Sequence, residues 1–236
     1  MSLDATVFGD IIENLKASAE KGDKPYFGFH VTCQGRGKYE SNYRTWGTDT
    51  NPLFENADVS PEANNILNNY LGSLKDTSWR LNSFVSEIEK MKEPVVVLIF
   101  SDYKPWLGDN NSVYNELGVN LNEYSADGFL NRYATEYVIV ANDAAKKALG
   151  KDLVGSGKPT SPCFLMSELF ELMGLEGSAF MQYTDEVNEK ILAMNHFGLI
   201  DDAITYYYPD VVPDDLREIR DEYKFVAYYD SKQTVE

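Results

Sequence analysis

The residue types that most often carry out catalysis are scarce in this chain and follow no recognised spacing. Its two histidines, His30 and His196, lie in an apolar segment and near the end of a predicted helix, which favours structural roles. Cys33 and Cys163 form no CxxC pair, and the chain has too few closely spaced His and Cys residues for a zinc site. No GxSxG motif is present. We therefore predict no catalytic residue, metal or cofactor.

Two glycine-containing stretches share their composition, but not their pattern, with phosphate-binding loops. Gly35 and Gly37 flank Arg36, yet no GxxxxGK[ST] motif is present and no third glycine opens a helix. In residues 155–159, a proline stands where the phosphate-binding motif has Ser or Thr. Both stretches are predicted to be flexible turns.

The chain is strongly acidic, with 38 Asp and Glu against 21 Lys and Arg and a formal charge of −17. This charge repels nucleic-acid phosphates and anionic lipid heads, so direct binding of nucleic acid or membrane is not expected. This acidity fits solubility alone, weak binding of divalent cations, or a partner protein with a basic face. The candidate contact acids lie in segment 201–236: Asp214, Asp215, Asp221 and Glu222.

Aromatic residues gather in three segments that lack a clear helical or strand period. A tyrosine ring is apolar while its hydroxyl seeks a hydrogen bond, so such residues suit contact surfaces. One segment lies in a predicted long loop over 38–60, and loops longer than about 15 residues are often functional. The candidate contact aromatics are Tyr39, Tyr43 and Trp46, then Tyr103 and Trp106, and finally Tyr206, Tyr207 and Tyr208.

No targeting signal stands out in the sequence. The first residues lack a basic region followed by a long apolar core, and no segment approaches the roughly 20 apolar residues of a transmembrane helix. We expect a cytoplasmic protein, or a component of a virion. A reducing compartment favours free thiols, although the sequence leaves a disulfide between Cys33 and Cys163 open.

The unbroken apolar run 94–100 predicts a strand buried on both faces, at the centre of a sheet. Residues 161–166 are predicted to be a strand with 178–183 as its hairpin partner, or else 167–174 forms a helix. The other predicted strands are 26–33, 135–141 and 224–229. The other predicted helices are 4–21, 61–72, 78–92, 112–117, 125–133, 143–149, 184–197 and 213–223.

Between residues 24 and 198, the order of these elements resembles that of the thioredoxin-like fold. The apolar strand that runs into Pro105–Trp106 is similar to the strand before that family's redox loop. Ser161–Pro162 lies where the family carries its cis-proline. The resemblance implies a sheet layered between helices. The redox cysteines are missing from residues 103–107, so dithiol chemistry is excluded at this loop.

We therefore predict one α/β domain over 1–236, with a mixed central sheet and helices on both faces. Its parts are an N-terminal helix (1–23), the core (24–198) and an acidic extension of one helix and one strand (199–236). The predicted function is a non-catalytic protein–protein interaction module or assembly subunit, such as a phage or viral accessory protein. The alternatives are an acidic DNA mimic that inhibits a nucleic-acid-binding enzyme, and a hydrolase or transferase without a recognised motif.

Overall fold

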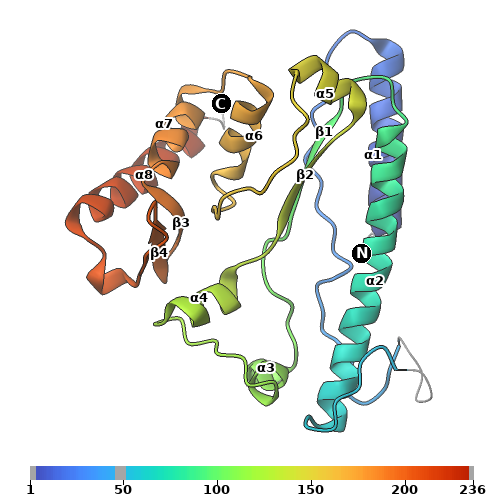
Figure 1. Ribbon diagram of the computed structural model, residues 1–236, viewed down its shortest axis with the longest axis vertical. Helices are drawn as coiled ribbons and strands as arrows, with labels where there is room; N and C mark the ends of the chain where they lie inside the picture. The colour runs from blue at the N-terminus through green and yellow to red at the C-terminus, as the bar shows by residue number, and fades with distance from the viewer. Residues whose placement is uncertain (1–3, 46–51, 234–236) are drawn as a thin grey trace. The chain divides into compact units, whose positions relative to one another are not determined.

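The computed structural model describes residues 4–45 and 52–233, and the chain divides into two compact units (Figure 1). Unit 1 contains Met1–Asn120 and Glu136–Leu153, and unit 2 contains Leu121–Thr135 and Val154–Glu236. Each unit combines helices with a small antiparallel sheet, so the predicted α/β class is confirmed. The predicted mixed central sheet is wrong, because the strands of the described residues form one two-stranded and one three-stranded sheet.

Two long helices of unit 1, α1 (Asp4–Lys21) and α2 (Pro61–Glu89), pack against each other (Figure 1). Phe8 stacks on Phe84 across this contact, with the ring centroids 4.9 Å apart. Apolar side chains along one face of α1 pack in this contact, and α1 has the bounds that the sequence predicts.

Helix α2 runs through Gly72 without a break, although the sequence predicts two helices, 61–72 and 78–92. It begins as predicted at Ser60, whose side chain accepts a hydrogen bond from Ala63 N–H at 3.1 Å. An interior glycine costs a helix only ~1 kcal/mol relative to alanine. Burial along one face of α2 outweighs that cost, and the predicted break does not occur.

Side-chain amides of α2 hold the described part of the irregular segment 38–60. Asn68 is fully buried, and its Oδ1 accepts a hydrogen bond from Leu53 N–H at 2.7 Å. Asn69 Nδ2 donates to the carbonyl of Glu40 at 2.9 Å. These amides replace the backbone partners that a segment without regular structure lacks, which fixes its course over the helix.

Strands β1 (Val96–Phe100) and β2 (Tyr137–Ala141) form an antiparallel ribbon in unit 1, with Leu98 opposite Ile139. The prediction that 94–100 is a central strand is wrong. Among the described residues β1 pairs with β2 alone, so its other edge is open. An apolar run indicates that a strand can be buried. The number of strands that pair with it depends on parts of the chain that are distant in sequence.

Asn142 links this ribbon to the next helix, as its sequence position predicts. Its Oδ1 accepts hydrogen bonds from Ala145 N–H at 2.9 Å and from Val95 N–H at 3.0 Å. Helix α5 (Asp143–Leu149) follows and ends at Gly150, whose φ of +64° suits glycine.

Short helices connect β1 to β2. The helices predicted over 112–117 and 125–133 are confirmed as α3 (Ser112–Glu116) in unit 1 and α4 (Ala126–Tyr133) in unit 2. A single 3₁₀ turn, η1 (Asp109–Asn111), precedes α3.

The strand predicted over 26–33 does not form. This segment is extended and largely exposed, and it is tied at its two ends. Ser18 Oγ donates to the carbonyl of Lys24 at 3.3 Å, and Gln34 Nε2 donates to Asp76 Oδ2 at 2.6 Å. Its residues favour a strand, and the segment is extended, but it forms no backbone hydrogen bonds with a neighbouring strand among the described residues.

Unit 2 is built around a three-stranded sheet in the order β3-β4-β5 and the helices packed on it. Phe164, Ile191 and Leu199 are fully buried in its core. Its elements after α4 are α6 (Leu165–Met173), α7 (Ala179–Asn188), β3 (Ile191–Asn195), β4 (Gly198–Asp201), β5 (Tyr206–Tyr207), η2 (Pro209–Val211) and α8 (Asp214–Gln233).

The strands predicted over 161–166 and 178–183 are wrong. These residues lie in the turn before α6, in its first turn and in α7, so the alternative helix over 167–174 is the better prediction. The peptide bond before Pro162 is not among the cis bonds of the described residues.

Two further elements of unit 2 differ from prediction. The helix predicted over 184–197 is wrong at both ends, since α7 begins at Ala179 and ends at Asn188. Asn195 turns the chain and gives β3 the partner β4. The strand predicted over 224–229 is part of α8, in which Tyr223 and Ala227 lie one turn apart and face the core. No helix in the described residues is both long and apolar enough to cross a membrane.

Candidate functional site

Two loops of unit 1 bring two cations against two aromatic rings. Arg36 and Lys38 come from the turn that follows the extended segment 26–33. Tyr103 and Trp106 come from the loop after β1. We call Arg36, Lys38, Tyr103 and Trp106 the cation–aromatic cluster.

Each cation of the cluster lies close to one ring. The Arg36 guanidinium carbon is 5.8 Å from the centroid of the Tyr103 ring, and Arg36 Nε donates a hydrogen bond to the Tyr103 hydroxyl. Lys38 Nζ is 5.8 Å from the centroid of the Trp106 ring and 3.6 Å from Asp109 Oδ1. Both distances fit cation–π attraction.

The loop after β1 is held in place by a buried side chain and by hydrogen bonds to two of its carbonyl groups. Leu107 is buried in the core of unit 1, and its carbonyl accepts a hydrogen bond from Val113 N–H at 3.2 Å. The Tyr114 hydroxyl donates to the carbonyl of Pro105 at 2.9 Å. The neighbouring Trp106 nevertheless remains 49% exposed, so an anchored loop presents its aromatic face to solvent.

Tyr39 fixes the other loop. Its hydroxyl donates to the carbonyl of Gly35 at 2.7 Å, and its ring packs edge-on against Tyr70 with centroids 5.7 Å apart. Burial, followed by the influence of Tyr70, raises the pKa of Tyr39 to about 12. Tyr39 is therefore a neutral hydrogen-bond donor rather than a base. Gly37, which lies between Arg36 and Lys38, has a φ of +78°, a conformation that suits glycine.

The cluster is a basic spot in an acidic chain. Residues 24–38 contain no Asp or Glu, but they include three basic residues, Lys24, Arg36 and Lys38. The hydrogen bond that Arg36 donates to Tyr103, as the largest cause, raises the pKa of Arg36, so the guanidinium stays charged. Exposed cations beside aromatic faces can bind a ligand that carries both an anionic group and an apolar face.

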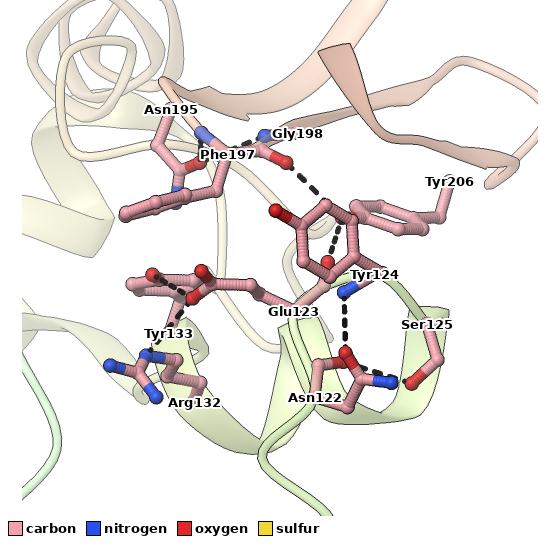
Figure 2. Close-up of polar contacts among 10 residues, drawn as sticks. All are labelled: Asn122, Glu123, Tyr124, Ser125, Arg132, Tyr133, Asn195, Phe197, Gly198 and Tyr206. Atoms are coloured by element: carbon pink, nitrogen blue, oxygen red, sulfur yellow. Dashed lines mark hydrogen bonds and ion pairs between the residues drawn. The ribbon is translucent and has the colours of Figure 1, made fainter. Parts of the chain in front are cut away.

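Unit 2 contains a second group of charged and aromatic residues, shown in Figure 2. Glu123 Oε2 accepts a hydrogen bond from the Tyr133 hydroxyl at 3.0 Å and lies 3.3 Å from Arg132 Nε. The Tyr206 hydroxyl donates to the backbone carbonyl of Glu123 and, at 3.2 Å, to that of Phe197. We call Glu123, Arg132, Tyr133 and Tyr206 the Glu123 cluster.

Stacked rings and turns complete this second group. The rings of Tyr133 and Phe197 stack with centroids 5.5 Å apart. Asn195 Oδ1 accepts hydrogen bonds from the N–H groups of Phe197 and Gly198 at 2.8 and 3.1 Å, which closes the turn between β3 and β4 (Figure 2). Burial, followed by the hydrogen bond to Glu123, raises the pKa of Tyr133. The polar groups satisfy one another, so this cluster joins α4 to the sheet.

The structure brings some of the predicted contact residues together. Tyr39, Tyr103 and Trp106, predicted from two separate segments, meet in unit 1. Tyr43 is 52% exposed, and Trp46 lies outside the described residues. Their roles as contact residues stay predictions.

The other predicted contact residues lie in unit 2. Tyr206 belongs to the Glu123 cluster. The Tyr207 hydroxyl donates to a carboxylate oxygen of Asp201 at 3.1 Å, and Tyr208 packs edge-on against another tyrosine ring at 6.2 Å. In α8, Asp214 and Asp221 form ion pairs with neighbouring basic residues, while Asp215 and Glu222 are exposed. A contact role for these residues also stays a prediction.

Sequence reasoning missed Arg36 and Lys38 as members of a site. The turn was assigned no role because it lacks the phosphate-loop pattern. The usable signal was the absence of acids from 24 to 38 in so acidic a chain.

Both cysteines are free, and no three His, Cys, Asp or Glu side chains of the described residues gather as metal ligands.

Comparison with known proteins identifies the family. The sequence profile described as sulfatase matches residues 1–175, which is more than half of the 236 residues. This chain belongs to the sulfatase family. It is also 23% identical over 220 residues to a protein of Rhizobium meliloti (strain 1021) named "Putative cyclic beta-1,2-glucan modification protein". The match covers 89% of this chain and 32% of that relative, so the chain spans about a third of the relative's length. No solved structure matches.

These matches overturn the main functional prediction. The thioredoxin-like resemblance is wrong, because the chain belongs to the sulfatase family. Several of the elements whose order suggested it are not formed, and the bond before Pro162 is not among the cis bonds of the described residues. A non-catalytic interaction module, a viral accessory protein and a DNA mimic are likewise contradicted by membership of an enzyme family. Strong acidity is a property that soluble enzymes share with those classes, so it could not separate them.

Proposed function

We propose that this chain forms part of a hydrolase or transferase that acts on an anionic ester carried by a carbohydrate, and that the cation–aromatic cluster binds this ester. The family name concerns sulfate esters, and the name of the Rhizobium relative concerns a glucan. The observation that carries the proposal is the pair of exposed cations held against two aromatic rings in a chain of charge −17.

The cluster supplies the two kinds of contact that such a ligand needs. The bond to Tyr103 uses only Nε of Arg36, and a guanidinium has four further N–H donors for the oxygens of a sulfate or phosphate group. Lys38 adds a second positive charge. The exposed face of Trp106 offers an apolar surface on which a sugar ring can pack.

In a group-transfer reaction, negative charge grows on the oxygens of the transferred group or of the leaving group. Cations that are already in place stabilise this charge without rearrangement. Our proposal therefore assigns binding of the ester and stabilisation of its charge to Arg36 and Lys38.

The test is calorimetric titration of this chain with three β-glucan oligosaccharides that are sulfated, phosphorylated or unsubstituted. The sulfated or the phosphorylated ligand should bind at least roughly tenfold more tightly than the unsubstituted one, as expected for a charge-assisted contact. Which of the two binds more tightly identifies the ester. Equal affinity for all three ligands would contradict the proposal.

Two variants locate the binding. Lys38→Gln should weaken binding of the charged ligand, whereas Lys224→Gln should leave its affinity unchanged. The two lysines are matched, because each is exposed and lies near one aspartate, at 3.6 Å for Lys38 and 3.3 Å for Lys224. An equal loss in both variants would show that binding follows total charge rather than the cluster.

A further inference from the structure

Residues 26–31 form an extended segment of unit 1 (Figure 1, blue trace after α1). The apolar side chains of this segment are uncovered. Phe27, Phe29 and Val31 are 69%, 72% and 62% exposed. Alternate residues of an extended chain point to the same face, so these three side chains form one apolar row. Folded proteins rarely leave such a row open unless it is an interaction surface.

The opposite face of this segment is closed by its own side chains. The Tyr26 hydroxyl lies 2.9 Å from His30 Nε2, and the two side chains meet over Gly28. A Cβ at Gly28 would lie 2.5 Å from the Tyr26 hydroxyl oxygen, so a larger residue there would displace this contact. The apolar row and the backbone edges therefore remain for a partner.

The backbone of the segment is unpaired. Among the described residues, no backbone–backbone hydrogen bond involves residues 25–32. The segment is nevertheless held extended between two tethers, the bond from Ser18 to Lys24 and the bond from Gln34 to Asp76. An extended chain with open N–H and C=O groups is the template to which another strand adds.

The charge around the segment limits the partner. Lys24 precedes it, Arg36 and Lys38 follow it, and no acid lies between residues 24 and 38. A strand with apolar side chains in alternation and acidic residues at its ends complements this surface. A second copy of this chain, at −17, carries the same overall charge and is disfavoured at long range.

We propose that residues 26–31 pair as an edge strand with a strand of a partner protein, apolar in alternation and acidic at its ends. The backbone groups of the added strand satisfy those of the segment, and its apolar side chains lie beside Phe27, Phe29 and Val31. The inference does not require ester binding, although Arg36 and Lys38 contribute positive charge to both surfaces.

The test uses a fluorescein-labelled peptide of alternating valine and threonine with glutamate at both ends. Its fluorescence anisotropy is followed as this chain is added. We expect saturable binding that weakens roughly tenfold or more in Phe29→Ser, because a large apolar contact is lost. Phe29 is exposed, so this change leaves the fold intact.

Two controls distinguish strand pairing from non-specific hydrophobic binding. Phe225→Ser should leave binding unchanged, since Phe225 of α8 is 69% exposed, as Phe27 is. A peptide with proline at its centre should not bind, because proline cannot donate a ladder hydrogen bond. Absence of saturable binding, equal loss in Phe225→Ser, or equal binding of the proline peptide would each overturn the proposal. Sedimentation that shows a dimer lost in Phe29→Ser would also overturn it, by making a second copy the partner.

Discussion

An arginine lies over a tyrosine ring at the same distance in both units, yet the two arginines have different surroundings. Arg36 over Tyr103 and Arg132 over Tyr133 each have a guanidinium-to-centroid distance of 5.8 Å. In unit 2, Glu123 lies 3.3 Å from Arg132 and neutralises it. In unit 1, no carboxylate of the described residues lies within ion-pair distance of Arg36.

Under the proposed function, this difference separates a cluster that holds unit 2 together from a cluster that binds a ligand. The Glu123 cluster uses its charge internally: the Tyr133 hydroxyl donates to the Glu123 carboxylate, and the Tyr206 hydroxyl donates to a backbone carbonyl of the same unit. The cation–aromatic cluster keeps positive charge at an exposed surface that a buried leucine and a half-buried tyrosine hold in place. Substitutions in the first should change stability, and substitutions in the second should change ligand binding.

The largest effect is expected from the buried anchor of the loop. Leu107→Ala should lower the free energy of unfolding by about 2–5 kcal/mol, as for other buried leucines, and should also abolish binding of the charged oligosaccharide. Ile200→Ala in unit 2 is the matched control, since Leu107 and Ile200 are both 4% exposed. It should destabilise the chain but spare binding by the folded protein. Urea titration and calorimetry measure the two quantities, and loss of binding in both variants would contradict the distinction.

The next effect is expected from the two arginines. Arg36→Gln should weaken the charged ligand roughly tenfold, corresponding to about 1.4 kcal/mol, with little change in stability. Arg132→Gln should leave the affinity unchanged and lower the melting temperature, because Glu123 loses its counter-ion. The reverse pattern, measured by calorimetry and thermal unfolding, would exchange the roles of the two clusters.

A smaller effect is expected from single hydroxyl groups. Tyr206→Phe removes the donor to the carbonyls of Glu123 and Phe197 and should cost about 0.5–1.5 kcal/mol of stability. Tyr103→Phe should leave stability nearly unchanged, because the partner Arg36 is exposed and water replaces the lost contact. Equal destabilisation in urea titrations would mean that both clusters are structural.

The smallest effect is expected at alkaline pH. The pKa of Tyr39 is raised from 10.0 to about 12, so between these values the hydroxyl ionises in the unfolded chain but not in the folded one. The folded state then holds the extra proton, and the stability contributed by this group falls as pH rises through that range. Tyr39→Phe should make the decline between pH 10 and 12 shallower in urea titrations. An unchanged slope would show that Tyr39 does not hold its proton more tightly when folded.

Local signals in the sequence predicted many elements because the relevant physics is local. Ser60 and Asn142 cap helices through their own side chains, and α1 follows from its apolar spacing. The extended segment 26–31 shows the limit of such signals. Its residues favour a strand, but pairing requires a partner that the local sequence does not contain.

The errors in unit 2 have a related cause. An apolar run such as 224–229 fits a strand or a buried helix equally well, and packing of Tyr223 on the core decides for the helix. The candidate site was half predicted, because Tyr103 and Trp106 were recognised by type. Arg36 and Lys38 were missed, since their meeting with those rings depends on two loops that are far apart in sequence.

The most direct test of the cation–aromatic cluster follows the fluorescence of Trp106 alone. A variant with Trp46→Phe and Trp79→Phe retains Trp106 as its single tryptophan, and Trp79 is 64% exposed, so its replacement should be tolerated. Titration with the sulfated and phosphorylated β-glucan oligosaccharides should give a saturable change with at least one of them, and this change should be absent with the unsubstituted oligosaccharide. An unchanged Trp106 signal, or the same change with all three ligands, would contradict ester binding at this cluster.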